Sequence, residues 1–402
     1  MQNNNLALFG GQPQQKTKLH PYISIGNEEL GVVKEIMKTG MLSGFVASSE
    51  ERFYGGEYVK KFEEHFAESH CVNHGVSFNS ATSAIIAAIG ALNLCEGDEV
   101  IVPAQTMSAT AASLMAFNLV PVFADVETET FGIDPKSIEE KITTKTKAIM
   151  VVHLYGHPAR MDEILKIAKK FDLKIIEDCA QAPLAKYKNR FVGSFGDIGV
   201  FSFNYHKHVN CGEGGIAITN NSELKERMCL IRNHGEVKGS TDESFKALGW
   251  NFRLTELQAG IAFEQTKKMP ELVNKKRELS RFLTSLLTQK FEWVKPPVEL
   301  PFCESSYYDY PMIFNFDYIG LSKEKFIEIT AAENLPITES YKPLYWQSLY
   351  SPEVNLKNKI CINAEDLFNK YCLTFEVCSY NLNKRVMSNI FSMFKKIEQS
   401  VI

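Results

Sequence analysis

A lysine at position 207 stands where an apolar run gives way to a glycine-rich turn. The run Ile198–Phe203 is strand-like and ends just before it, and Gly212-Glu-Gly-Gly215 opens the next strand-like run. Open α/β sheets bind ligands beyond the carboxyl ends of their strands. A lysine amine in that place can form a Schiff base with a carbonyl cofactor. A solvated loop lysine is the competing interpretation, and position alone does not decide between the two.

An aspartate at position 178 follows the strand-like run Lys174–Glu177. A carboxylate at the end of a buried strand must be paired or hydrogen-bonded, because burying an unpaired charge is costly. A cationic pyridinium nitrogen facing Asp178 would meet that demand and make the cofactor a better electron sink. The alternative is an N-cap for the following segment, since Asp is common at the start of helices.

A third segment, Gly75–Ala84, carries Ser80, Thr82 and Ser83 into an apolar helical pattern. Hydroxyls and free backbone N–H groups at a helix N-terminus form a ready phosphate site. Plain capping of the helix by Ser and Thr is the other interpretation. In chain order, the three segments would supply a phosphate cradle, a ring-nitrogen carboxylate and a Schiff-base lysine, a set that suits pyridoxal phosphate.

The elements that must position these segments alternate between strand and helix from about residue 60 to residue 220. The strand-like runs suit strands covered by helices on both faces, and the alternation predicts a mostly parallel, doubly wound sheet. We therefore expect an α/β protein whose large domain has three layers, α/β/α. The expected strands are Glu99–Val102, Pro121–Val126, Ala148–Leu154, Lys174–Glu177, Ile198–Phe203 and Gly215–Thr219. The expected helices are Tyr58–Ser69, Ser80–Leu94 and Met161–Phe171.

The pattern changes after Asn251, where a smaller C-terminal α+β domain is expected. Its expected elements are one or two long helices within Arg253–Lys290, interrupted near Pro270, a strand at Tyr307–Phe316, and helices at Ser322–Glu333 and Asn383–Ile397. We divide the chain into an N-terminal segment (1–30), a large cofactor-binding domain (31–265) and a small domain (266–402).

The composition of the 402 residues narrows the class of protein. A content of 45% hydrophobic and 23% charged residues excludes a largely disordered chain. A net charge of −4 without a basic block argues against nucleic acid as a partner. The 9 cysteines are scattered and form no Cys-x-x-Cys pair, so we expect a reducing cytosol and no metal site. With no signal-peptide pattern and no long apolar run, a cytoplasmic protein without membrane contact is expected.

Several motifs together resemble the DegT-type sugar aminotransferases over about residues 20–350. That family has the fold type I architecture of pyridoxal phosphate-dependent transferases and moves an amino group from glutamate to keto-sugars carried on nucleotides. The matching motifs are Glu177-Asp-Cys-Ala-Gln-Ala182, Ser202-Phe-Asn-Tyr-His-Lys207 with Gly212-Glu-Gly-Gly215, Gly249-Trp-Asn-Phe-Arg-Leu-Thr-Glu256, Phe123-Ala-Asp-Val126 and Val152-His-Leu-Tyr-Gly-His-Pro158.

The resemblance implies roles for the residues that match. Lys207 would hold the cofactor as a Schiff base and move protons, and Asp178 would pair with its ring nitrogen. Gln181 would lie against the cofactor ring or its hydroxyl side. The phosphate would be bound by Ala81, Thr82 and Ser202, and by Asn251 of a neighbouring subunit. This last role makes a homodimer part of the active site.

Two positions depart from the family's pattern. Ala81 replaces the usual glycine but stays small, so close backbone approach is kept. Met107 replaces the usual aromatic residue on the cofactor ring. A thioether still covers a π-face, for about 0.3–1.5 kcal/mol, so we expect weaker stacking and not lost binding.

Substrate recognition is weakly encoded. The resemblance places Gly40–Gly56, which includes Tyr54, over the sugar pocket, although an ordinary surface loop is equally compatible with this segment. It also places Tyr341–Trp346 near the substrate, where Lys342 faces either a diphosphate or water. His208 is a candidate substrate contact, although the histidines beside Lys207 are more typical of residues that shape the loop. Structural roles are expected for His153, His157 and His234.

The expected function is amino transfer from L-glutamate to a nucleotide-linked keto-sugar, in amino-sugar biosynthesis for a surface polysaccharide or glycoconjugate. One branch of the family has histidine in place of the lysine and removes a hydroxyl, so Lys207 favours transamination. A ketocyclitol aminotransferase and a pyridoxal phosphate-dependent sugar dehydratase are the enzyme alternatives. A regulatory protein that binds the cofactor or a sugar is the non-enzyme alternative.

Overall fold

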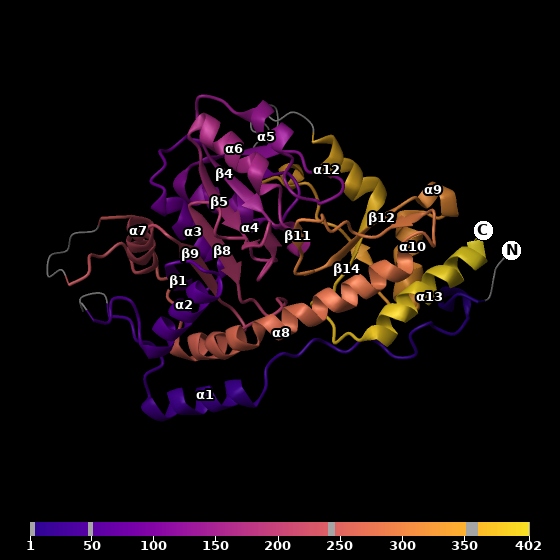
Figure 1. Ribbon diagram of the computed structural model, residues 1–402, viewed down its shortest axis with the longest axis horizontal. Helices are drawn as coiled ribbons and strands as arrows, with labels where there is room; N and C mark the ends of the chain where they lie inside the picture. The colour runs from indigo at the N-terminus through magenta and orange to yellow at the C-terminus, as the bar shows by residue number, and fades with distance from the viewer. Residues whose placement is uncertain (1–4, 47–50, 240–245, 351–360, 402) are drawn as a thin grey trace.

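A seven-stranded sheet forms the centre of the larger part of the molecule (Figure 1). The computed structural model describes residues 5–46, 51–239, 246–350 and 361–401. The strand order is β1-β9-β8-β5-β4-β2-β3. The strands are β1 (His74–Phe78), β2 (Glu99–Pro103), β3 (Val120–Ala124), β4 (Thr146–Val152), β5 (Lys174–Asp178), β8 (Ile198–Ser202) and β9 (Gly215–Thr219).

The sheet is mostly parallel, which confirms the predicted α/β class. The pairs β2·β3, β2·β4, β4·β5 and β5·β8 are parallel, and only β9 runs antiparallel to its two neighbours, β1 and β8. The carboxyl ends of β4, β5 and β8 therefore meet at one edge of the sheet. This is the edge at which the predicted cofactor residues Asp178 and Lys207 were expected.

Helices cover both faces of this sheet and complete the three layers. On one face, α3 (Ala81–Ala91) and α7 (Ser222–Arg232) share an apolar core with alternate residues of the strands. On the other face lie α2 (Glu57–Ser69), α5 (Pro135–Lys141), α6 (Met161–Phe171) and the first part of α8 (Glu256–Leu287). The strands are buried from both sides, as their continuous apolar sequences predict.

The strand β1 was not predicted from the sequence, because polar residues interrupt its apolar pattern. Ser77 is fully buried in it, and both its backbone N–H and its hydroxyl donate to Glu63 Oε1, at 2.8 and 2.7 Å. Arg232, also fully buried, donates to the same oxygen at 2.5 Å. This ionic cluster satisfies the polar groups that would otherwise exclude Ser77 from a buried strand.

The C-terminal part contains a second, antiparallel sheet with its own core. Its strand order is β10-β12-β14-β13, with β10 (Val294–Lys295), β12 (Tyr310–Phe314), β13 (Thr338–Glu339) and β14 (Cys372–Phe375). Trp293, Phe314, Phe326 and Phe394 pack together beside it, between α10 (Lys323–Ala332) and α13 (Lys384–Val401). The expected strand and helices of this region are present, with shifted ends.

The helix α8 runs without a break from the first core to the second, where α13 packs against it (Figure 1). Pro270 lies inside it, where the sequence predicted an interruption. The helix continues because Met269 and Val273, on either side of the proline, are both buried in the same core. The expected boundary between residues 265 and 266 thus falls within one helix, and the division into domains stays a prediction.

A third sheet and several short elements complete the fold. The sheet has the order β11-β6-β7, from β6 (Lys186–Tyr187), β7 (Arg190–Phe191) and β11 (Cys303–Glu304). The remaining helices are α1 (Asn27–Thr39) and the short elements η1 (Ala7–Phe9), α4 (Ala109–Ala112), η2 (Ser113–Phe117), η3 (Leu154–Gly156), α9 (Phe316–Ile319), η4 (Leu344–Trp346), α12 (Ile362–Asp366) and the π-helical turn η5 (Leu367–Tyr371).

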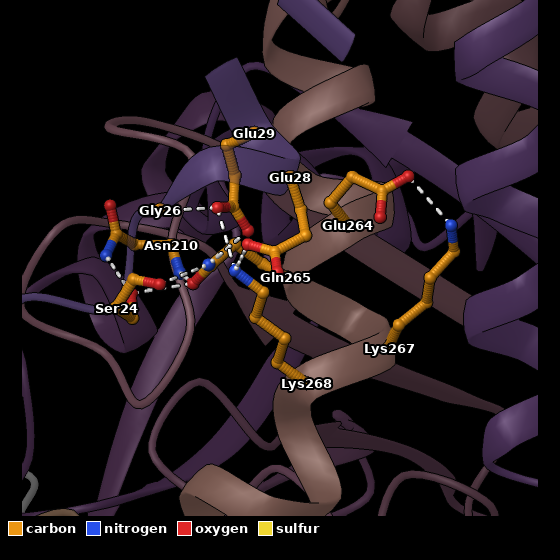
Figure 2. A network of polar contacts seen from close by, with 9 residues as sticks. All are labelled: Ser24, Gly26, Glu28, Glu29, Asn210, Glu264, Gln265, Lys267 and Lys268. Atoms are coloured by element: carbon orange, nitrogen blue, oxygen red, sulfur yellow. Dashed lines mark hydrogen bonds and ion pairs between the residues drawn. The ribbon is translucent and has the colours of Figure 1, made fainter. Parts of the chain in front are cut away.

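A polar network connects the N-terminal arm, residues 5–30, to α8 (Figure 2). Gln265, fully buried on α8, donates to Glu29 Oε1 at 2.8 Å and to the Ser24 carbonyl at 3.0 Å. Its Oε1 accepts from the Ser24 hydroxyl at 2.7 Å and from the Asn210 backbone N–H at 3.3 Å. Lys268 contacts Glu29 Oε2 at 2.9 Å. Because Asn210 lies in the loop that carries Lys207, the network also anchors that loop.

Candidate active site

A cavity of about 470 Å³ opens at the carboxyl ends of β4, β5 and β8. It brings together residues that are far apart in the sequence but that the sequence analysis had singled out. The predicted residues that line it are Ala81, Thr82, Met107, Asp178, Gln181, Ser202, Lys207 and Tyr341. The cavity is therefore the place where the predicted cofactor site is assembled.

Lys207 lies in the loop after β8, and its side chain enters the cavity. Its backbone N–H donates to the Asn204 carbonyl at 2.9 Å, and its Nζ lies 4.2 Å from the centre of the Tyr308 ring. Burial lowers the pKa of Lys207, while the charges of Asp178 and Asp309 oppose that shift. A lysine with a lowered pKa is a better nucleophile near neutral pH, because more of its amine is unprotonated.

Asp178 ends β5 and is buried at the wall of the same cavity. Its Oδ2 accepts from the Thr110 hydroxyl at 2.9 Å and its Oδ1 from the Ala180 backbone N–H at 3.1 Å. Burial raises the pKa of Asp178, and these hydrogen bonds and Lys207 act in the opposite direction. The N-cap interpretation of Asp178 is wrong, because a turn and not a helix follows β5, and the bond from Ala180 belongs to that turn. A cationic ring nitrogen would stabilise the buried carboxylate.

The first turn of α3 faces the cavity with Ala81 and Thr82. The Ser80 hydroxyl caps the helix by accepting from the Ser83 N–H at 3.1 Å. The N–H groups of Ala81 and Thr82 have no acceptor within the helix, as is general for a first turn. Gly215 of β9 lets this turn approach closely, since a Cβ there would lie 2.5 Å from the Ala81 nitrogen. With Ser202 on the same cavity wall, these groups fit a phosphate.

Gln181 and Tyr341 close one side of the cavity through a hydrogen bond. Gln181 Nε2 and the Tyr341 hydroxyl lie 2.9 Å apart, and Gln181 Oε1 accepts from the Tyr155 backbone N–H at 2.7 Å. Both side chains are thereby held in fixed positions. Met107 lines the cavity but is 49% exposed, and its sulfur accepts from the Ala109 N–H at 3.1 Å.

A buried pair next to Asp178 fixes the position of β5. His153 Nε2 and Glu177 Oε2 are 3.0 Å apart, and His153 Nδ1 accepts from the Ala159 N–H at 3.0 Å. Glu177 also accepts from the backbone N–H groups of Gly193, Phe195 and Gly196. His153, Glu177 and Cys179 lie close enough to hold a metal ion. The histidine and carboxylate atoms are already used in hydrogen bonds, which supports the structural role expected for His153.

Four of the predicted residues do not line the cavity. The Tyr54 hydroxyl donates to Glu226 at 2.8 Å, and His208 is fully buried with its Nε2 2.8 Å from the Ser306 carbonyl. Lys342 is exposed, with Nζ 5.9 Å from the centre of the Trp346 ring. Asn251 is exposed and its Oδ1 accepts from Arg253 Nε at 2.9 Å. The role expected of Asn251 belongs to a second subunit and stays a prediction.

Three contributors to the site were missed by the sequence analysis. Thr110 carried no signal, because a threonine in an Ala/Ser-rich stretch has many uses. Tyr308 and Asp309 stand at the start of an expected strand, Tyr307–Phe316. A carboxylate inside such an apolar run was the signal for them, since a strand that enters a core seldom carries an unpaired acid.

No helix in the described parts of the chain is long and apolar enough to cross a membrane.

The fold and this site define a pyridoxal phosphate-dependent aminotransferase. The chain belongs to the DegT/DnrJ/EryC1/StrS aminotransferase family, whose model matches residues 36–381. The family assignment and the fit of the cavity agree on pyridoxal phosphate as the cofactor.

Similar proteins include enzymes that act in sugar chemistry. The chain is 38% identical to GDP-perosamine synthase of Escherichia coli O157:H7 over 260 residues, 64% of this chain and 70% of that protein. It is 35% identical to L-glutamine:2-deoxy-scyllo-inosose aminotransferase of Streptoalloteichus tenebrarius over 305 residues, 73% of this chain and 72% of that protein. The structure of Helicobacter pylori PseC, an aminotransferase of pseudoaminic acid biosynthesis, superposes with a TM-score of 0.85 at 29% identity, covering 95% of this chain and 100% of that one.

Proposed function

We propose that this aminotransferase moves an amino group from L-glutamate to a nucleotide-linked keto-sugar. The observation that carries the proposal is that Lys207 and Asp178 line one cavity, where the charge of Asp178 acts to raise the pKa of Lys207. The first turn of α3 lines the same cavity. The sugar substrate is supported by the resemblance to GDP-perosamine synthase, whose name denotes a nucleotide sugar.

The residues that line the cavity have different roles in this reaction. When bound, pyridoxal phosphate supplies the carbonyl carbon that takes up the amino group and the ring that stores the electron pair. The first turn of α3 and Ser202 bind its phosphate, and Asp178 holds a proton on its ring nitrogen. Lys207 Nζ would hold the cofactor through its carbonyl carbon. Once the amine of the donor displaces it, the free lysine amine would take the proton from the α-carbon of the donor and, in the second half of the reaction, deliver a proton to the carbon of the acceptor that becomes aminated. Tyr308 covers the lysine and limits the access of water.

A homodimer is part of this proposal. Asn251 lies at the surface, and its backbone pairs with Asn233 in an isolated bridge. An exposed amide held in this way can reach the phosphate of a neighbouring subunit, as the resemblance to the family implies.

A ketocyclitol is the second candidate for the acceptor. It is favoured by the similarity to L-glutamine:2-deoxy-scyllo-inosose aminotransferase, whose name also points to glutamine as a donor. A panel of UDP-, dTDP- and GDP-linked keto-sugars and an inosose, each assayed with L-glutamate and with L-glutamine, separates these possibilities.

The test of the site itself is the substitution Lys207→Ala. We expect the purified variant to lose the visible absorbance of cofactor linked to the chain, and to lose turnover by at least about 10²-fold, since proton transfer by a positioned base contributes 10²–10⁴-fold. Lys166→Ala, at an exposed position of α6, is the matched control and should keep both. Near-normal turnover of Lys207→Ala would show that the assignment is wrong.

A further inference from the structure

A second pocket, of about 260 Å³, adjoins the cavity that holds Lys207. The two share His206, Tyr308 and Tyr341 as lining residues. The second pocket reaches from there toward β12, β13 and β14 of the antiparallel sheet. A substrate whose reacting carbon lies at Lys207 therefore has space in this pocket for the remainder of its structure.

Two carboxylates face each other in this pocket. Tyr310 of β12 pairs with Phe375 of β14, and the register places Asp309 opposite Glu376 at the next position beyond the strands. Like charges directly opposite each other on paired strands are destabilising. Two facing carboxylates lower the stability of the fold, and such a pair beside an active-site cavity is explained by a ligand that binds to both.

Neither carboxylate forms an ion pair or a hydrogen bond with the described parts of the chain, although the charge of Lys207 acts on Asp309 from a distance. Within the described ranges, Asp309 and Glu376 have no hydrogen bond or ion pair of standard geometry, whereas the third acid of the pocket, Glu339, lies 3.1 Å from Lys323. Burial, and then the charge of Glu376, raise the pKa of Asp309 to about 8, and Lys207 acts in the opposite direction. A cation entering the pocket would remove this cost.

A buried hydroxyl gives independent support for a ligand. Tyr155 also lines the pocket and is 3% exposed, and its hydroxyl makes no hydrogen bond of standard geometry in the described parts of the chain, with the Tyr341 backbone as its polar neighbour. Buried polar groups are nearly always satisfied, so an unpartnered one beside a cavity marks a place for a polar ligand. Further hydroxyls on the pocket wall come from Thr338, Ser340, Thr374 and Ser379.

We infer that this pocket binds a protonated amine of the substrate, through Asp309 and Glu376, while its hydroxyls bind the polar groups around that amine. The inference rests on the proposed function and narrows its substrate class to amine-bearing molecules. The amine is carried by the acceptor, as on an amino-sugar or aminocyclitol. A diphosphate is excluded from this pocket by like-charge repulsion and must bind elsewhere.

The test is equilibrium binding to the holoenzyme, followed by isothermal titration calorimetry. Cyclohexylamine is compared with 1,3-diaminocyclohexane, and n-butylamine with 1,4-diaminobutane, so that each pair differs by one ammonium group. We expect the diamine to bind at least about tenfold more tightly, since hydrogen bonds to charged groups are the strong ones. A larger ratio for the ring pair supports an amine on the acceptor, and a larger ratio for the open-chain pair would contradict that placement.

Variants of the pocket decide whether these residues cause the preference. In Asp309→Asn and in Glu376→Gln the ratio should fall toward one, and in Glu339→Gln, whose carboxylate is already paired, it should persist. Because each ratio is taken within one variant, a general loss of binding cancels. Equal binding of monoamine and diamine to the wild type, or an unchanged ratio in both variants, would overturn the inference. Binding is measured without turnover, so failure here is distinguishable from failure of the proposed reaction.

Discussion

Replacing Gln265 by leucine should weaken both the fold and the active site. The side chain is fully buried on α8 and makes four hydrogen bonds, to the N-terminal arm, to Glu29 and to the backbone of Asn210 (Figure 2). Leucine has a similar volume, so the packing is largely kept and the polar contacts are lost. Glu29, 1% exposed, would keep Lys268 and Gly26 as partners but lose the amide.

The expected cost follows from these contacts. A neutral hydrogen bond contributes about 0.5–1.5 kcal/mol and one to a charged group about 1.5–3 kcal/mol. Contacts of one residue are not additive, so we expect a loss of about 3 kcal/mol in the free energy of unfolding. With an unfolding entropy of about 2.1 cal/mol/K per residue, a chain of 402 residues then loses about 3–4 °C in Tm.

The assay is calorimetric unfolding of the holoenzyme at one scan rate, combined with turnover measurements. Turnover should fall as well, because Asn210 anchors the loop that carries Lys207. Lys267→Met is the matched control from the same turn of α8, where an exposed ion pair with Glu264 at 2.7 Å is removed. Exposed pairs contribute little, so its Tm should change by less than about 1 °C. A Tm of Gln265→Leu within 1 °C of the wild type would refute the reasoning.

Two further predictions concern the phosphate site and the pH dependence of stability. Gly215→Ala places a Cβ 2.5 Å from the Ala81 nitrogen. Overpacking of about 1–3 kcal/mol should weaken pyridoxal phosphate binding to the cofactor-free protein about tenfold. Gly31→Ala, with open space around it, should leave the dissociation constant unchanged, and equal affinity of both variants would contradict the prediction. Burial lowers the pKa of His70 from 6.5 to about 4, so unfolding takes up a proton between these values and stability falls as the pH drops below 6.5. His70→Phe, among the rings of Phe66 and its neighbours, should remove about 2 kcal/mol of the loss between pH 7.5 and pH 5, and an unchanged pH slope of Tm would show that another group is responsible.

The central strands could be predicted because their sequences report burial directly. The runs that became β5, β8 and β9 are apolar along their length, and each was expected within one or two residues of its observed ends. The strand β1 was missed because its buried Ser77 is compensated by Glu63 and Arg232, which come from other elements. Such compensation is a tertiary property that no local pattern contains.

The residues of the site also fall into two groups, those that a local sequence pattern reveals and those that only the tertiary structure brings together. Lys207 and Asp178 were found because strand ends of a parallel sheet meet at one edge, which the alternation of elements already implies. Tyr308 reaches the cavity, and Asp309 the pocket beside it, from the residues just before β12, whereas Thr110 reaches Asp178 from the short helix α4. The sequence shows neither of these arrangements.

The continuity of α8 bears on how the enzyme receives its substrates. A helix of 32 residues is a rod about 48 Å long, and both hydrophobic cores are built against it. A hinge motion that separates the part with the seven-stranded sheet from the part with the antiparallel sheet would require α8 to bend. The walls contributed by Asp178 and by Tyr341 are therefore held at a fixed separation, so reactants enter a chamber whose dimensions are set before they arrive.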